Sequence, residues 1–265
     1  MIPLRRGWIG IRGWRQRVNW AARKFYGARP AIRIVAIAVI ALLGLTTINL
    51  VYHVLYKPTE MFALISSEFD KAPVDTWRHY GSLFREYSTA AVSPELLAAL
   101  AQVEAAGNPV ARTYWRWQLS WNPLALYQPA SSSVGMFQMT DAAFAETQGF
   151  CIHDHIVTED GCRLHWLYFR VVPSHAIQLA AVYLDRNVAK IVAEHIGARP
   201  NPEHKRELAA IIHLCGAGVA KAFAQRGYRL LAGERCGEHF VTTYLARVKA
   251  MEREFRRLAS GPPWL

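Results

Sequence analysis

Hydrophobic and polar residues divide this chain into two parts of different character. Residues 34–52 form a run without a single charge, Ile34-Val-Ala-Ile-Ala-Val-Ile-Ala-Leu-Leu-Gly-Leu-Thr-Thr-Ile-Asn-Leu-Val-Tyr52. As a helix this run would be about 28 Å long, which is close to the thickness of a bilayer core. Beyond residue 57, apolar residues recur every three or four positions, as they do in amphipathic helices. The pattern predicts a membrane-spanning helix over 34–56 and a mostly α-helical part after it.

The residues around this run favour an uncleaved membrane anchor. Arg33 and Lys57 bracket it, and Tyr52, His53 and Tyr56 stand where interfacial aromatic residues belong. A cleaved signal peptide would have a shorter N-terminal region and a small-x-small cleavage site, and neither is present. A buried core helix is the other interpretation, but the run is apolar on all sides. We therefore expect a single-pass anchor.

The distribution of charge orients the anchor. The formal charge of +11 resembles that of a nucleic-acid-binding protein, yet residues 1–33 contain no acid and the rest of the chain is nearly neutral. By the positive-inside rule, the arm of residues 1–33 is cytoplasmic and the chain from about residue 57 lies outside. The arm is either a plain topology determinant or an amphipathic segment on anionic lipid. Its basic residues are Arg5, Arg6, Arg12, Arg15, Arg17, Arg23, Lys24, Arg29 and Arg33.

The external part is predicted to be a series of helices. A lead-in over 57–92 contains a helix at 76–87 with Asp75 as its cap, the main domain covers 93–258, and a tail follows over 259–265. No phosphate loop, metal-binding motif or Ser/His/Asp order emerges, so we expect no cofactor and no metal. Within the domain we expect helices at 93–107, 141–148, 174–196, 203–226 and 238–258.

The four cysteines, Cys151, Cys162, Cys215 and Cys236, all lie in the predicted external part. An even number there suits two disulfides in an oxidising compartment. Three pairings are possible, and we favour Cys151–Cys162 and Cys215–Cys236 because each closes a loop-like stretch. A zinc site is the competing interpretation, but the chain has no CxxC pair.

Glu104 is the most informative polar residue. Ser93 and Pro94 begin a short helix and Gly107 ends it, while Leu97 and Leu100 lie on the same face as Glu104. A carboxylate on an apolar face is partly dehydrated, and dehydration favours the protonated form that a general acid needs. A solvated glutamate at a fraying helix end is the plain alternative.

Several segments, taken in order, resemble a known family. Residues 96–111 read Leu-Leu-Ala-Ala-Leu-Ala-Gln-Val-Glu-Ala-Ala-Gly-Asn-Pro-Val-Ala, and 131–140 read Ser-Ser-Ser-Val-Gly-Met-Phe-Gln-Met-Thr. They are similar to the essential-Glu helix and the Gly-Leu-Met-Gln-type segment of the lytic transglycosylases with the soluble-lytic-transglycosylase, lysozyme-like fold. The later family pieces are similar to Gln178–Leu184, to His213-Leu-Cys-Gly216 at the Tyr-Asn-Ala-Gly motif, and to Tyr244. The likeness covers roughly residues 72–255.

The resemblance implies a lysozyme-like domain after a single transmembrane helix, with Glu104 as the catalytic residue. In the family, one Glu protonates the bond between N-acetylmuramic acid and N-acetylglucosamine, and then takes a proton from the 6-hydroxyl to close a 1,6-anhydro ring. No second acid follows at a motif-like position, although Asp141 and Glu146 stay open as candidates. The expected substrate contacts are Gly135, Met136, Phe137, Gln138, His213 and Tyr244, and the flat rings of Trp115, Trp117 and Trp121 suit sugar faces.

Three departures from the family pattern keep other functions open. Ala105 replaces the usual Ser, His213 and Leu214 replace Tyr and Asn, and thirty residues separate Glu104 from Gly135. We expect a bacterial inner-membrane protein with a periplasmic domain, acting on peptidoglycan glycan strands and not on nucleic acid. The alternatives are a hydrolytic muramidase and a catalytically silent glycan-binding subunit that joins envelope-machine proteins for secretion or exopolysaccharide export.

Overall fold

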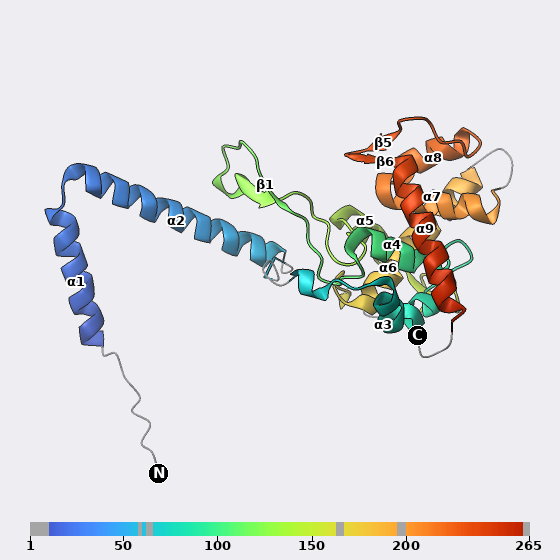
Figure 1. Ribbon diagram of the computed structural model, residues 1–265, viewed down its shortest axis with the longest axis horizontal. Helices are drawn as coiled ribbons and strands as arrows, with labels where there is room; N and C mark the ends of the chain where they lie inside the picture. Colours follow the sequence, from blue (N-terminus) through green and yellow to red (C-terminus); the bar gives the residue numbers. More distant parts are fainter. Residues whose placement is uncertain (1–10, 58–59, 62–65, 163–166, 195–199, 262–265) are drawn as a thin grey trace, which may run out of the picture.

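The computed structural model describes residues 11–57, 60–61, 66–162, 167–194 and 200–261. Helices dominate these residues, accompanied by a few short strands. Figure 1 shows two N-terminal helices extending away from the remaining helices, which gather at the other end of the molecule. The first ten residues of the basic arm, the end of the helix expected over 174–196 and the last residues of the tail lie outside the described residues.

The N-terminal helices are α1, Ile11–Gly27, and α2, Pro30–Tyr56. Within Pro30–Leu55, an 18-residue window has a mean hydropathy of 2.5, and the stretch is long and apolar enough to cross a membrane. The helix begins four residues before the predicted boundary at Ile34 because Pro30 occupies its first turn, where the missing backbone N–H costs nothing. The structure therefore confirms one long apolar helix near the N-terminus.

The core forms around helix α4, Pro94–Ala105. Ser93 caps it as predicted, accepting a hydrogen bond from the Leu96 N–H at 3.2 Å, and Ala106 ends it in the left-handed conformation. Residues 96–101 are all buried. Helix α4 packs against α3, Pro73–Glu86, and α9, Val241–Ala259, while α6, Pro173–Glu194, packs against α7, Pro202–Cys215.

Three details differ from the prediction. Helix α3 begins at Pro73 with Ala72 as its N-cap, and Asp75 lies inside its first turn, paired with Arg78 at 2.9 Å. The single helix expected over 203–226 is two helices, α7 and α8, Ala217–Gln225, because Gly216 takes a φ of +80° between them. Helix α9 begins at Val241 instead of residue 238 because a short hairpin precedes it.

Among the described residues, the strands form three two-stranded antiparallel hairpins. Their segments are too short to give the alternating pattern that predicts a strand from sequence. One-turn helices η2, Ser66–Phe69, and η3, Pro123–Ala125, and helix α5, Asp141–Thr147, complete the described elements. The hairpins pair β1, Trp115–Trp117, with β2, Tyr127–Pro129; β3, Cys151–His153, with β4, Ile156–Thr158; and β5, Arg235–Cys236, with β6, His239–Phe240.

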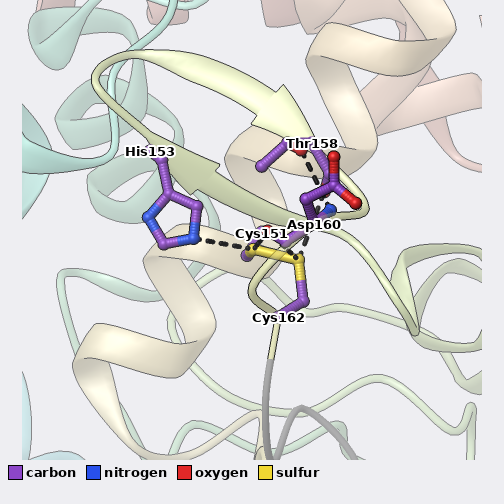
Figure 2. Close-up of a disulfide and its surroundings, with 5 residues drawn as sticks. All are labelled: Cys151, His153, Thr158, Asp160 and Cys162. Atoms are coloured by element: carbon purple, nitrogen blue, oxygen red, sulfur yellow. Dashed lines mark hydrogen bonds between the residues drawn. A yellow bond between two sulfur atoms is a disulfide. The ribbon is translucent and has the colours of Figure 1, made fainter.

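Both disulfides form in the pairing that the sequence favours. Cys151–Cys162 joins β3 to the loop after β4, and Figure 2 shows His153 beside it, with a ring nitrogen 3.3 Å from Cys151 Sγ. Cys215–Cys236 joins the end of α7 to β5. The second bond therefore holds the β5–β6 hairpin against the helix end that also carries His213.

Removing the Cys215–Cys236 bond, by Cys215→Ala with Cys236→Ala, is expected to lower the free energy of unfolding by about 2–4 kcal/mol. The bond closes a loop with a sequence separation of 21 residues, so it restricts the unfolded chain substantially. Urea unfolding of the detergent-solubilised chain, followed by circular dichroism, measures the change. Reductant should destabilise the wild type by a larger amount, since it opens both bonds. An unfolding curve that reductant leaves unchanged would contradict this.

Candidate active site

Glu104 lies on the last turn of α4, on the face that the sequence assigned to it. Leu100 and Leu97, one and two turns earlier, are fully buried in the core. The Glu104 side chain is 19% exposed, so the carboxylate is mostly shielded and still reachable from solvent. The helix thus holds a partly dehydrated acid at the edge of the core.

Tyr244 on α9 is the closest partner of this acid. Its hydroxyl donates a hydrogen bond to Glu104 Oε1 at 2.5 Å, across 140 residues of sequence. Burial first, and then the negative charge of Glu104, raise the pKa of Tyr244 well above its usual value of 10. The phenol therefore keeps its proton through the neutral range and stays a donor to the carboxylate.

His213 on α7 approaches the same carboxylate oxygen. Its Nε2 lies 3.6 Å from Glu104 Oε1, and its ring meets the ring of Phe137 edge-to-face at 6.4 Å. Helices α7 and α9 therefore meet α4 at Glu104, and the turn that carries Phe137 contacts His213. In the part of the chain that the structure describes, these polar contacts go to Oε1 and none goes to Oε2.

The turn at Gly135–Gln138 uses its own side chains to hold its shape. Gly135 has a φ of +78°, and a Cβ there would lie 2.2 Å from the carbonyl oxygen of Arg170. Gln138 donates hydrogen bonds from Nε2 to the carbonyl oxygens of Gly135, at 2.9 Å, and Ala111, at 3.3 Å. Met136 and Phe137 are buried. The turn positions Phe137 against His213, and sugar contact by these residues stays a prediction.

Trp115, Trp117 and Trp121 lie away from Glu104. They belong to the β1–β2 hairpin, which Figure 1 shows projecting beside α2, apart from α4, α7 and α9. The Trp115 indole donates to Glu60 Oε2 at 2.5 Å, and Trp117 stacks on Tyr127 at 4.6 Å. The structure does not bring these rings into the Glu104 cluster, so their predicted sugar contacts gain no support from their position.

Polar residues that the sequence analysis passed over fix the end of α4. Gln102 accepts from Thr76 Oγ1 at 2.7 Å and donates to the carbonyl of Lys71 at 2.9 Å. Asn108 is buried and donates to Asp70 Oδ1 at 2.8 Å. The only signal in the sequence is the Gly-Asn-Pro that ends the helix. These bonds tie the turn after Glu104 to the segment before α3.

A cavity of about 420 Å³ adjoins this helix end at Ala105, the residue after Glu104. It is open, and polar and apolar atoms line it in similar proportion; Glu104 itself is not part of its wall. Its other walls come from η2 and from the chain between α4 and β1: Ser66, Ser67, Asp70, Asn108, Ala111, Arg112, Thr113 and Tyr114.

The cluster contains one acid, one phenol and one imidazole. Asp141, the nearest rival in the sequence, is exposed and pairs with Arg170 at 2.5 Å. Within the described residues, the contacts of Glu104, Tyr244 and His213 include no second carboxylate, and no group of three or more His, Cys, Asp or Glu side chains could hold a metal ion. The chemistry available here is proton transfer through a single carboxyl group.

No protein-family model matches this chain, and no curated protein matches it in sequence.

Proposed function

We propose that this chain is a membrane-anchored lytic transglycosylase with a lysozyme-like domain. The observation that carries the proposal is the hydrogen bond from Tyr244 to Glu104. The resemblance to the family pairs a late tyrosine with the essential Glu, and these two residues lie far apart in the sequence. His213 also approaches Glu104, and Phe137 packs against His213, so two further pieces of the family pattern lie near this pair in the expected order.

In the proposed reaction, Glu104 serves as both acid and base. Its carboxyl proton moves to the glycosidic oxygen as the bond to C1 of N-acetylmuramic acid breaks, assisted by the substrate's own acetamido group. The 6-hydroxyl oxygen then bonds to C1, and its proton returns to the Glu104 carboxylate. Tyr244 and His213 hold Oε1, which orients Oε2 toward the reacting oxygens. One carboxyl group suffices because the nucleophile comes from the substrate, unlike the paired acids of most glycosidases.

The proposed location follows from α2 and the charge pattern. The basic arm lies in the cytoplasm, α2 is an uncleaved anchor in a bacterial inner membrane, and the disulfide-bonded domain faces the periplasm. Peptidoglycan glycan strands are then within reach of Glu104.

A silent glycan-binding subunit of an envelope machine is the second candidate. Ala105 and Leu214 favour it, because the usual Ser hydroxyl and Asn amide are absent from the region of the acid. Product chemistry separates the candidates. The full-length chain in detergent is incubated with purified sacculi, and soluble fragments are weighed by mass spectrometry. Ends in 1,6-anhydro-muramic acid, lighter by one water than hydrolysed ends, support the proposal. Reducing ends indicate a muramidase, and an absence of fragments favours the silent subunit.

Tyr244→Phe is expected to lower kcat by about 10- to 100-fold, since a hydrogen bond to a charged group contributes about 1.5–3 kcal/mol. KM should change little because the hydroxyl contacts Glu104 and not the glycan. Initial rates of fragment release measure both constants. Tyr80→Phe is the control, because Tyr80 is buried in the core on α3. Equal losses in both variants would assign Tyr244 to packing alone.

A further inference from the structure

We propose that the hairpin of residues 115–129 inserts its tip into the surface of the bilayer that α2 crosses. This segment, named here the aromatic hairpin, contains β1, η3 and β2. The inference rests on α2 being an uncleaved anchor and goes beyond the proposed reaction. The aromatic hairpin then supplies a second membrane contact that fixes the height and orientation of the catalytic domain.

The tip of the aromatic hairpin is bound to α2 itself. Asn49 donates from Nδ2 to the carbonyl oxygen of Leu124 at 3.0 Å, and His53 Nε2 lies 2.9 Å from the same oxygen. Both side chains are buried, whereas most of the apolar residues of α2 are exposed. A polar side chain in a membrane helix is costly unless it finds a partner. The carbonyl oxygen of Leu124, in the aromatic hairpin, is that partner for both Asn49 and His53.

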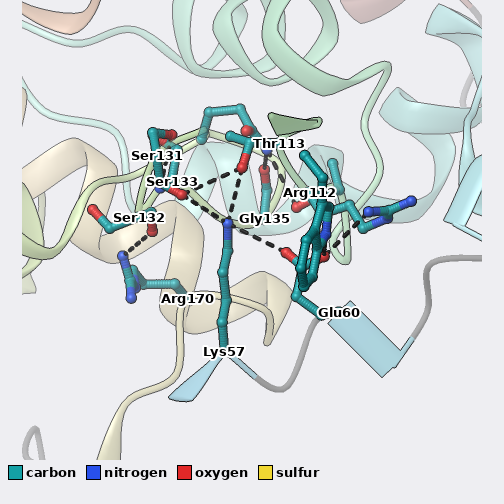
Figure 3. A network of polar contacts seen from close by, with 12 residues as sticks. Lys57, Glu60, Arg112, Thr113, Ser131, Ser132, Ser133, Gly135 and Arg170 are labelled. Carbon is teal, nitrogen blue, oxygen red and sulfur yellow. Dashed lines mark hydrogen bonds and ion pairs between the residues drawn. The ribbon is translucent and has the colours of Figure 1, made fainter. Parts of the chain in front are cut away.

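The root of the aromatic hairpin is bound to the end of α2 by a buried ionic network. Glu60 is buried, with Lys57 Nζ at 3.5 Å from its Oε1 and Arg112 Nη1 at 3.1 Å from its Oε2. The Trp115 indole donates to the same carboxylate, and Lys57 also donates to Thr113 Oγ1 at 3.1 Å. Figure 3 shows Lys57 and Arg112 converging on Glu60. The hairpin is thus held to α2 at two levels.

These contacts place the hairpin tip at membrane depth. Asn49 lies seven residues before Tyr56, so the contact with Leu124 is about 10 Å along α2 from its end. Side chains there meet the interfacial region of the bilayer, where Trp is enriched.

The exposed side chains of the aromatic hairpin suit that environment. Trp117 is 78% exposed, and Leu119 and Trp121 are fully exposed. The segment contains no acid and a single base, Arg116, whose long side chain can reach lipid phosphates. Such a cluster in water would be an unfavourable apolar surface, whereas the lipid surface buries it.

Photocrosslinking in the full-length chain tests the inference. The chain is reconstituted into vesicles of phosphatidylethanolamine and phosphatidylglycerol with p-benzoylphenylalanine in place of Trp121. The matched control replaces Phe240, an exposed aromatic residue on β6, at the side of the domain away from α2 in Figure 1. After irradiation, mass spectrometry of the protein should show about tenfold more phospholipid adduct at position 121 than at position 240.

The other outcomes overturn the inference, and a flotation experiment shows whether the hairpin insertion or the α2 anchor is the claim that fails. Equal amounts of phospholipid adduct at positions 121 and 240, or no adduct at 121, would show that the aromatic hairpin does not insert into the bilayer surface. Adducts with glycan at position 121, when sacculi are added, would return the aromatic hairpin to sugar binding. Flotation of the same vesicles tests the anchor separately. If the chain does not float with lipid, α2 is not a membrane anchor. If it floats but gives no lipid adduct at position 121, only the proposed insertion of the aromatic hairpin is disproved.

Discussion

Glu104→Gln is expected to slow the cleavage of glycan strands by about 10²–10⁴-fold while leaving sacculus binding intact. Glutamine keeps the shape of the side chain, and its amide oxygen can still accept the hydrogen bond from Tyr244. It can neither protonate the glycosidic oxygen nor accept the proton of the 6-hydroxyl. Because the described cluster around Glu104 holds no second carboxylate, no neighbour can take over either step.

For Glu104→Gln, the release of soluble fragments measures cleavage, and pelleting of the protein with sacculi measures binding. Glu95→Gln is the matched control, since Glu95 lies in the first turn of the same helix. That control removes a charge favourable to the helix N-terminus, at a cost of about 0.3–1 kcal/mol of stability, and should cleave at the wild-type rate. If Glu104→Gln retains wild-type cleavage, another group is the acid. If the wild type does not cleave and both proteins bind equally, the silent subunit is the better description.

Gly135→Ala is expected to lower the free energy of unfolding by about 2–5 kcal/mol. Two effects add. An L-residue at a positive φ costs about 1–2 kcal/mol, and overpacking against fixed atoms costs about 1–3 kcal/mol more. The added Cβ would meet the backbone oxygen of Arg170 at 2.2 Å, and backbone cannot rotate away as a flexible side chain can.

Gly149→Ala separates the two effects in Gly135→Ala. Gly149 has a φ of +87°, and a Cβ added there meets nothing within 4 Å. This control should therefore lose only the conformational part, about 1–2 kcal/mol. Urea unfolding of both variants in detergent gives the difference. Equal losses would mean that the turn relaxes away from Arg170, and that Gly135 is needed only for its backbone conformation.

Local sequence accounts for helix α4, which carries Glu104, and for the long apolar helix α2. Ser93, Pro94 and Gly107 set the ends of α4, and the spacing of its leucines directs Glu104 to the core edge, because these signals act within a few residues. The length and uniform apolarity of residues 34–52 predict α2 in the same way. The disulfide pairing follows as well, since each bond closes a short stretch of chain.

Contacts between residues that are distant in the sequence could be expected only from the resemblance to a known family. The residues between Glu104 and Tyr244 contain no local feature that pairs them; helix periodicity led to Glu104, and the family pattern alone led to Tyr244. The geometry depends on how α4 packs against α9. Similarly, Gln138 looks from its sequence like a substrate contact, whereas its amide donates to the carbonyl of Gly135 in its own turn and to that of Ala111.

Tertiary structure alone decided the placement of the aromatic hairpin and the break at Gly216. Five aromatic residues between Tyr114 and Tyr127 suit sugars, a core or a membrane equally well from composition. Their position is set by hydrogen bonds to Asn49, His53 and Glu60, and the buried side chains of Asn49 and His53 find their partner in the hairpin. The helix pattern runs through Gly216, but its positive φ separates α7 from α8. The sequence determines helix periodicity and helix caps because both depend on neighbouring residues. Buried polar groups find their hydrogen-bond partners only when distant segments meet.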